Sequence, residues 1–229
     1  MLPTFQKIEP ISKKARVVAS LREAIVSGAI RSGVQIVEGK LAQQLGVGQG
    51  LIREALIELE HQGFVQRIPF SGTQVTELTL KDAQQIFDLR IELEPLAFFL
   101  AGPNVQPQDM SELKEMAERA TIASKAGDLD PFFENHLAFR RKVWKLSGNR
   151  YLDQVLERAV IPLYALYVIR QSYNLEGIRQ TTIDCTEHQD RILAAYERKS
   201  FEEARETARY FLRRMKDYLG TRLPPASTA

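Results

Sequence analysis

The segment from Ile36 to Val75 constrains what this chain can fold into more than any other part of the sequence. Leu41 and Leu45 lie on one face of a short helix, and Gly46 can take the left-handed conformation that ends it. A second helix follows directly, with an inner face made of Ile52, Ala55, Leu56 and Leu59. Two helices that meet across a short turn containing glycine form a helix-turn-helix unit.

Two strands are expected after this pair of helices. Phe64, Val65 and Ile68 precede a turn and Val75 follows it, which predicts a two-stranded hairpin, or wing. The second helix of a helix-turn-helix lies in the major groove of DNA. Residues 1–77, which we call the head, are therefore expected to form a winged helix-turn-helix DNA-binding domain.

Residues 78–229, which we call the body, show only helical patterns. Thr79 and Asp82 have the spacing of a capping box, which predicts the start of a long helix. About six helices with short connections between them predict an antiparallel bundle. The expected fold class is thus mainly α, an N-terminal winged helix-turn-helix followed by an all-α antiparallel helical bundle.

Composition limits the class of protein further. The 229-residue chain has no apolar run close to the roughly 20 residues that span a bilayer, and no signal-peptide core. Its single cysteine, Cys185, suits a reducing compartment, so we expect a cytoplasmic protein with no membrane contact. An enzyme is not expected, because the sequence has no glycine-rich phosphate loop, no nucleophile elbow and only three histidines.

The charge of the head is only slightly positive, with nine Lys and Arg against seven Glu. Clustering is therefore more informative than the total. Lys7, Lys13, Lys14 and Arg16 form a basic arm before the first expected helix. Such an arm either contacts phosphates or is simply solvated, and both interpretations stay open at this point.

Several short motifs recur along the chain in a recognisable order. In the head they are Leu45-Gly46-Val47, Arg53-Glu54-Ala55-Leu56, Gly63-Phe64-Val65 and Gly72. In the body they are Asp88-Leu89-Arg90-Ile91-Glu92 with Glu94, Ser147-Gly148-Asn149, and Glu187-His188. With these motifs the chain resembles the GntR family of regulators, and more closely its fatty-acid-regulator (FCD) subfamily. The resemblance implies a homodimer whose heads read a palindromic operator in double-stranded DNA and whose bodies carry an effector cavity.

The start of the recognition helix departs from the family pattern. Where the family usually has Ser-Arg-Thr-Pro-Val-Arg, this chain has Gly48-Gln49-Gly50-Leu51-Ile52-Arg53. The resemblance implies that the first arginine of the pattern contacts DNA, and here it is Gln49. Glutamine favours adenine whereas arginine favours guanine, so the operator is altered, or Gln49 merely faces phosphate or water. The expected DNA-binding residues are Lys13, Lys14, Arg16, Lys40, Gln49, Arg53, Arg67 and Gly72.

The body departs at the positions where relatives often bind a divalent metal. The resemblance places an Asp-x3-His pair of ligands at His136 and Arg140, a retained histidine at His188, and a last histidine near Phe211. Arginine has no lone pair to offer a metal, and phenylalanine has no donor atom. We therefore expect no required cofactor. A metal held by His136 and His188 is possible but disfavoured against two hydrogen-bonded core or cavity histidines.

Arg90 has two interpretations, a buried arginine paired with Glu94 one turn later or, as the resemblance implies, a residue of the effector cavity. Arg90 and Arg140 would offer two forks to a carboxylate or phosphate. The histidines would bind such an anion more tightly when protonated, so affinity should rise as pH falls toward ~6.5. The expected effector-binding residues are Arg90, Glu94, His136, Arg140 and His188, and Tyr164, Tyr167 and Arg170 line the same space or belong to the core.

These observations predict a ligand-responsive DNA-binding transcriptional regulator, a repressor, whose body senses a small anionic metabolite. The alternative is a helical ligand sensor with a degenerate head that lacks sequence-specific DNA binding. The altered start of the recognition helix motivates this alternative.

Overall fold

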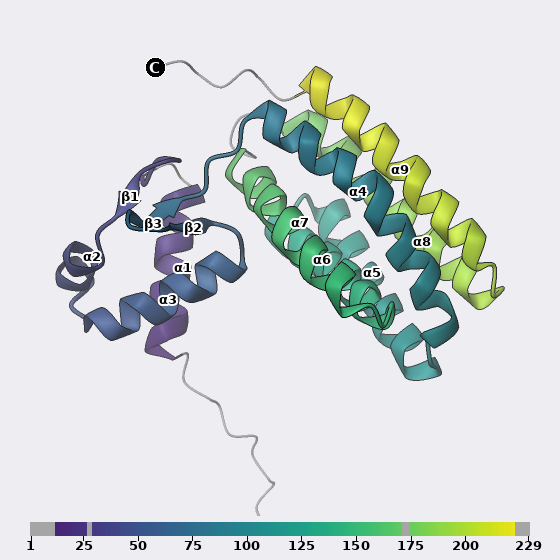
Figure 1. Cartoon of the computed structure of the whole chain (residues 1–229), viewed down its shortest axis with the longest axis horizontal. Helices are drawn as coiled ribbons and strands as arrows, with labels where there is room; N and C mark the ends of the chain where they lie inside the picture. The colour runs from purple at the N-terminus through teal and green to yellow at the C-terminus, as the bar shows by residue number, and fades with distance from the viewer. Residues whose placement is uncertain (1–11, 27–28, 171–174, 223–229) are drawn as a thin grey trace, which may run out of the picture. The chain divides into compact units, whose positions relative to one another are not determined.

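The computed structural model describes residues 12–26, 29–170 and 175–222 (Figure 1). Contacts between Cα atoms divide the chain into two compact units, residues 1–76 and 77–229. The division falls one residue before the boundary expected from the sequence. Lys7 lies outside the described residues, as do the side chains of Tyr164, Tyr167 and Arg170.

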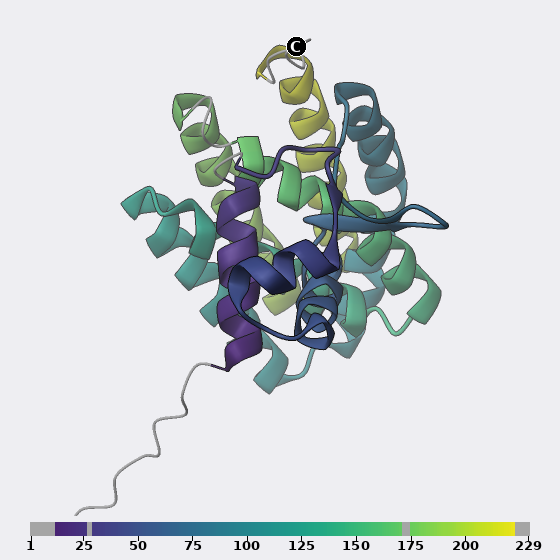
Figure 2. The ribbon, with the colours of Figure 1, turned by 90° about the vertical axis from the view of Figure 1, so that its left-hand side faces the viewer.

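The head consists of three helices and a small sheet. Its elements are α1 (Lys13–Val26), β1 (Gln35–Ile36), α2 (Glu38–Leu45), α3 (Gln49–His61), β2 (Val65–Ile68) and β3 (Gly72–Val75). Gly46 ends α2 with φ 63°, in the left-handed region that glycine enters most easily. The helix-turn-helix and the hairpin predicted from the sequence are both present, and the hairpin extends as an arm in Figure 2.

The sheet has one more strand than the sequence predicted. β1 pairs antiparallel with β3, with Gln35 opposite Gln74 and Ile36 opposite Thr73, so the strand order is β1-β3-β2. Two residues are too few to show the alternation that identifies a strand. Ile36, the first residue of the segment singled out in the sequence, is a buried strand residue.

The predicted basic arm is also corrected by the structure. Lys13, Lys14 and Arg16 do not precede the first helix but form its first turn. The hydroxyl of Ser12 accepts a hydrogen bond from the backbone N–H of Ala15 at 3.1 Å, as an N-cap residue does. Lysine and arginine are good helix formers, so the helix begins as soon as this cap is available.

The body is a bundle of long helices. Its elements are α4 (Leu80–Ala101), the 3₁₀ turn η1 (Gly102–Asn104), α5 (Pro107–Ala126), α6 (Leu129–Leu146), α7 (Arg150–Arg170), α8 (Leu175–Glu197) and α9 (Phe201–Arg222). The capping box predicted at Thr79 and Asp82 is confirmed, since the N–H of each residue donates to the side chain of the other. The body is therefore all-α, as expected.

Helices α4 and α9 lie side by side and antiparallel (Figure 1). An ion pair joins Asp88 near the start of α4 to Lys216 near the end of α9. At the other end, Gly102 lies so close to the ring of Phe201 that a β-carbon would overlap it. The hydrophobic core draws residues from α4, α5, α6, α8 and α9. No helix within the described residues is long and apolar enough to cross a membrane.

Candidate nucleic-acid interface and ligand site

A groove of about 640 Å³ in the head is lined by β1, the start of α2, one residue of the recognition helix α3 and the wing. Its lining includes three of the residues predicted to bind DNA, Arg53, Arg67 and Gly72. Arg53 comes from α3, and the other two come from β2 and β3. The fold thus brings together basic side chains that are 14 residues apart in the sequence.

Both arginines of the groove have acidic partners within the head. Nη2 of Arg53 lies 2.8 Å from Oε2 of Glu38, and Nε of Arg67 lies 3.5 Å from a carboxylate oxygen of Glu60. The hydrogen bond to Glu38, and then its charge, raise the pKa of Arg53. The Arg53 side chain is still 60% exposed. Exposed ion pairs are weak, so a phosphate or a base edge can compete for either guanidinium.

The other predicted DNA-binding residues lie outside the groove lining. Lys14 pairs with Glu58 of α3 at 3.3 Å, and Lys13, Arg16 and Lys40 are exposed. Gln49 is the first residue of α3, and its side chain points toward α2. Its Nε2 lies 3.1 Å from the point where a β-carbon on Gly39 would be.

Phe70 is a residue of the groove that the sequence did not single out. Its side chain is fully exposed at the tip of the wing, and its φ is 65°. The turn around it is closed by a hydrogen bond from the Ser71 N–H to the Ile68 carbonyl at 3.0 Å. The side-chain amide of Gln35 in β1 donates to the Ser71 carbonyl, so this hydrogen bond links β1 to the wing tip.

The body contains a buried cluster of charged side chains from two helices. Arg90 and Glu94 lie one turn apart on α4, with Arg90 Nε 2.5 Å from Glu94 Oε1. Arg140 of α6 pairs with the other carboxylate oxygen of Glu94. The exposed fractions are 4% for Arg90, 0% for Glu94 and 1% for Arg140. Among the described residues, two buried guanidinium groups thus share the carboxylate of Glu94.

His136 lies one turn before Arg140 on the same helix. Arg140 Nε donates to His136 Nε2 at 3.3 Å, which requires a lone pair on that nitrogen. Burial, followed by the charge of Arg140, lowers the pKa of His136 well below its ordinary value of 6.5, although a hydrogen bond with Gln189 partly opposes this. His136 is therefore neutral at neutral pH.

His188 of α8 completes the predicted set. Its ring stacks on Phe211 of α9 with centroids 4.2 Å apart, and among the described residues neither ring nitrogen has a hydrogen-bond partner. Burial and the charge of Arg140 lower its pKa well below 6.5 as well. The expectation that these histidines gain protons as the pH falls toward 6.5 is thus wrong, because both imidazoles are buried beside permanent cations.

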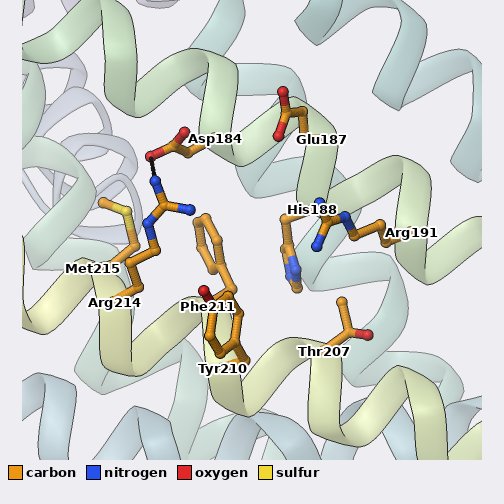
Figure 3. A pocket seen from close by; sticks show the side chains of 9 residues that line it. All are labelled: Asp184, Glu187, His188, Arg191, Thr207, Tyr210, Phe211, Arg214 and Met215. Carbon is orange, nitrogen blue, oxygen red and sulfur yellow. Dashed lines mark ion pairs between the residues drawn. The ribbon is translucent and has the colours of Figure 1, made fainter.

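Two small cavities flank the cluster. The inner one, of about 30 Å³, is lined by Arg90, His136 and Arg140 among others, and the outer one, of about 40 Å³ between α8 and α9, is lined by His188. Figure 3 shows the outer cavity, with the Arg214–Asp184 ion pair at its edge. Each has room for about two or three water molecules.

Two apolar side chains of α9 line both cavities: the aromatic ring of Phe211 and the thioether chain of Met215. They form the partition between the two spaces. The guanidinium carbon of Arg140 lies 5.7 Å from the Phe211 ring centroid, within cation–π distance. Cys185 also lines the inner cavity, and burial raises the pKa of its thiol to about 12, so the thiol is unreactive at neutral pH.

The residues present do not fit a divalent metal. Two positions at which the family resemblance implies metal-binding residues hold other side chains here. One is Arg140, whose guanidinium repels a cation, and the other is Phe211, which stacks on His188. The neighbouring oxygen donor Glu134 is exposed, and the Asn135 amide donates to the carbonyl of Pro131. Within the described part of the chain, no group of three or more His, Cys, Asp or Glu could hold a metal ion.

All five residues predicted for the effector site thus lie in or beside one buried cluster. Sequence reasoning placed Phe211 only as a missing ligand. Its role as a partition depends on the packing of α9 against α8, and no sequence motif predicts that packing.

Two family profiles match the chain. The profile described as "Bacterial regulatory proteins, gntR family" matches residues 13–75, and the "FCD domain" profile matches residues 85–214. The sequence is 27% identical to the HTH-type transcriptional regulator McbR of Escherichia coli over 180 residues, 78% of this chain and 81% of that protein. It is also 27% identical to the gluconate operon transcriptional repressor of Bacillus licheniformis over 186 residues, 81% of this chain and 73% of that one.

Solved structures show the same fold. The structure of E. coli McbR/YncC matches with a TM-score of 0.68 at 25% identity, over 93% of this chain and 99% of that chain. A GntR regulator from Rhodococcus sp. RHA1 matches with a TM-score of 0.65 at 19% identity, over the same two fractions. A winged helix-turn-helix followed by a helical bundle is thus common to all three chains.

Proposed function

We propose that this chain is a cytoplasmic, ligand-responsive repressor. The chain belongs to the GntR family of bacterial regulators and carries its FCD domain. It is therefore a DNA-binding transcriptional regulator rather than an enzyme. Its head would bind a palindromic operator as part of a homodimer. Its body would sense a small anionic metabolite without a required metal. Binding to chromosomal DNA is the reason for proposing the cytoplasm.

The single observation that supports the anionic ligand is the pair of buried guanidinium groups, Arg90 and Arg140, that line the inner cavity of the body. A buried charge is strongly unfavourable unless it is paired. Both guanidinium groups contact the single carboxylate of Glu94. Each guanidinium group can offer a carboxylate or phosphate in the cavity two parallel hydrogen bonds.

The ligand would enter by displacing the partition formed by Phe211 and Met215. Neither cavity is large enough for a metabolite while these side chains separate them, because ligand pockets ordinarily measure about 300–1,000 Å³. His188, whose ring nitrogens lack partners among the described residues, would then gain a hydrogen bond from or to the ligand. A shift of α9 relative to α8 is the expected structural response.

The test is a thermal-shift and calorimetric screen of the full chain against small mono- and dicarboxylates and sugar phosphates. An anion that stabilises the wild type should have no effect on Arg140→Gln. Arg141→Gln is the matched control, since Arg141 neighbours Arg140 but pairs with Glu157 at 2.9 Å at the half-exposed surface. Binding that survives Arg140→Gln but requires added zinc would refute the proposal.

The proposed division of labour between the two units is tested separately. Residues 78–229 should form a dimer alone, whereas residues 1–77 should bind DNA weakly, because the isolated head loses the effective concentration that a dimer supplies. Sedimentation equilibrium of the body fragment distinguishes a dimer from a monomer. A monomeric body would overturn the scheme.

A second candidate function has one observation in its favour. Arg53, which would read a base, is already paired with Glu38, and Gln49 replaces the arginine of the family pattern. The head would then bind DNA without sequence preference, or serve another contact, while the body still senses its ligand. Affinities for selected and scrambled duplexes, measured across salt concentrations, separate the candidates, since only nonspecific binding depends on charge alone.

A further inference from the structure

The tip of the wing holds a phenylalanine in a conformation that suits it poorly. Pro69 and Phe70 are the two central residues of the turn closed by Ile68 and Ser71. Proline is favoured at the first central position of such turns, but a positive φ at the second is normally taken by glycine or asparagine. Phe70 has φ 65°, and a bulky residue in that region is an outlier.

Packing within the head does not account for Phe70. Its side chain is fully exposed, so the ring gains nothing from burial on folding. Both its backbone conformation and its exposure are therefore unfavourable in the free protein. An unfavourable conformation that persists in a structure is a reason to look for function. Here a binding partner whose surface covers the ring would supply the stabilisation that the free protein lacks.

The groove that contains Phe70 indicates what covers it. Arg53 and Arg67 line the same groove with exposed guanidinium groups, so the partner is expected to carry negative charge. It must also offer an apolar surface to a ring. A DNA duplex has both, because phosphates flank a groove whose floor is formed by stacked bases, and proteins insert apolar side chains between such bases.

We infer that Phe70 is an apolar wedge that enters the minor groove beside each half-site and partly unstacks one base step. This inference rests on the proposed binding of the head to duplex DNA. With α3 in the major groove, the wing would reach the adjacent minor groove. Pro69 restricts the turn, and Gln35 holds its far side through the Ser71 carbonyl, so the ring is presented on a stiff support.

The wedge would contribute to operator choice without hydrogen bonds to bases. Pyrimidine–purine steps such as TA and CA unstack most easily. The sequence preference of the full chain should therefore include one such step outside the bases that Arg53 and Gln49 contact.

The experiment uses duplexes that the full-length protein selects from a random pool, with 2-aminopurine placed in turn at each step of the flanks. This base fluoresces more strongly when it is unstacked. Wild-type protein should raise the emission at one flanking step. Phe70→Gly should abolish this rise, weaken binding by roughly 5- to 100-fold, and erase the preference for a flexible step in a repeated selection.

Phe70→Gly also separates binding from folding. Glycine suits the positive φ, so this variant should be at least as stable as the wild type. Val34→Ala, which trims another exposed apolar side chain of the head that does not line the groove, should change neither binding nor emission. Phe70→Trp should keep both the emission change and the affinity within a few-fold.

Four outcomes would overturn the inference. If the wild type selects a duplex but no flanking step brightens, or if Phe70→Gly binds and brightens as the wild type does, the wedge is wrong and the proposed function stands. If Phe70→Gly changes only the sedimentation of the protein, the ring makes a protein contact. If no duplex is selected at all, the proposed function fails together with the wedge.

Discussion

Glu38 at the start of α2 and Arg53 in α3 form an ion pair across the helix-turn-helix, with Arg53 Nη2 2.8 Å from Glu38 Oε2. The pair holds the guanidinium in the groove beside the wing before DNA arrives. If Arg53 contacts DNA as proposed, a base or a phosphate must replace this carboxylate. Glu38 would then compete with DNA for the arginine.

This competition predicts opposite effects for the two partners. Arg53→Ala should weaken operator binding by about tenfold or more if Arg53 contacts a base. Glu38→Gln should strengthen it, because the arginine is released and a negative charge is removed, and the gain should shrink at high salt. Footprinting titrations at several salt concentrations measure both effects.

The matched control is Glu115→Gln, which breaks an exposed glutamate–arginine pair on α5 of the body. It should leave operator binding unchanged. In an Arg53→Ala background, the gain from Glu38→Gln should diminish, since the arginine that it releases is gone. An unchanged footprint for Arg53→Ala would show that Arg53 is not placed in the groove of the operator.

The buried cluster predicts a large stability effect for Glu94→Gln. The substitution keeps the size of the side chain but removes the carboxylate charge that two buried guanidinium groups contact. Breaking a buried pair in this way costs about 3–5 kcal/mol of unfolding free energy. Trp144, the only tryptophan of the chain and fully buried in α6, reports unfolding of the body by its fluorescence.

Added anion should partly restore this variant. Malonate or sulfate that binds only the folded state stabilises it by mass action and should raise the midpoint of Glu94→Gln more than that of the wild type. Glu157→Gln, at the half-exposed Arg141 pair, should cost no more than about 1 kcal/mol. Equal denaturation midpoints for Glu94→Gln and the wild type would contradict the account of the cluster.

His136 and His188 predict a pH dependence of stability. Their pKa values are lowered in the folded state, mainly by burial. Above pH 6.5 they are neutral in both states and contribute no slope. Below 6.5 the unfolded chain takes up protons that the folded chain does not, so stability falls as the pH falls, by up to about 1.4 kcal/mol per pH unit for each histidine.

Denaturant titrations followed by Trp144 fluorescence between pH 7.5 and 5.5 measure this slope. His188→Phe should reduce it by removing one of the two histidines whose pKa burial lowers. Anion affinity should stay flat over the same range. A slope that is identical in His188→Phe and the wild type would show that His188 does not stay neutral in the fold.

The mismatch between the cluster and a metal predicts how a metal site could be restored. Arg140→His combined with Phe211→His would place two new imidazoles beside His136 and His188, enough for a tetrahedral zinc site. The double substitution should retain near-stoichiometric zinc, measured by elemental analysis of untagged protein. Phe211→His alone should not, because the Arg140 guanidinium remains.

Stoichiometric zinc in the wild-type protein, removed by a chelator with loss of ligand binding, would refute this explanation. The apoprotein of the double variant serves as its own control, since it shows whether the two substitutions disturb the fold.

Sequence patterns predicted the fold well because its long elements repeat their apolar residues many times. The helix-turn-helix, the wing and the capping box at Thr79 follow from periodicity and from residues with special backbone roles, such as Gly46. Strand β1 was missed because two residues carry no period. The start of α1 depends on the cap that Ser12 supplies, which the apolar pattern does not show.

The candidate site was predictable in its members but not in its electrostatics. Spacing places Arg90 beside Glu94, and the resemblance picked out Arg140 and His136. No local pattern shows that Glu94 contacts an arginine 46 residues away, or that burial keeps both histidines neutral. These properties depend on how the helices pack, as does the partition by Phe211.

The burial of Cys185 has a practical consequence. Since this is the only cysteine of the chain and its thiol stays protonated and covered, the native protein is in effect a background without reactive thiols. A cysteine introduced at an exposed position such as Arg31 of the head can then be labelled selectively. Two such labels in a dimer would report the distance between the heads, with and without ligand, in an otherwise unaltered protein.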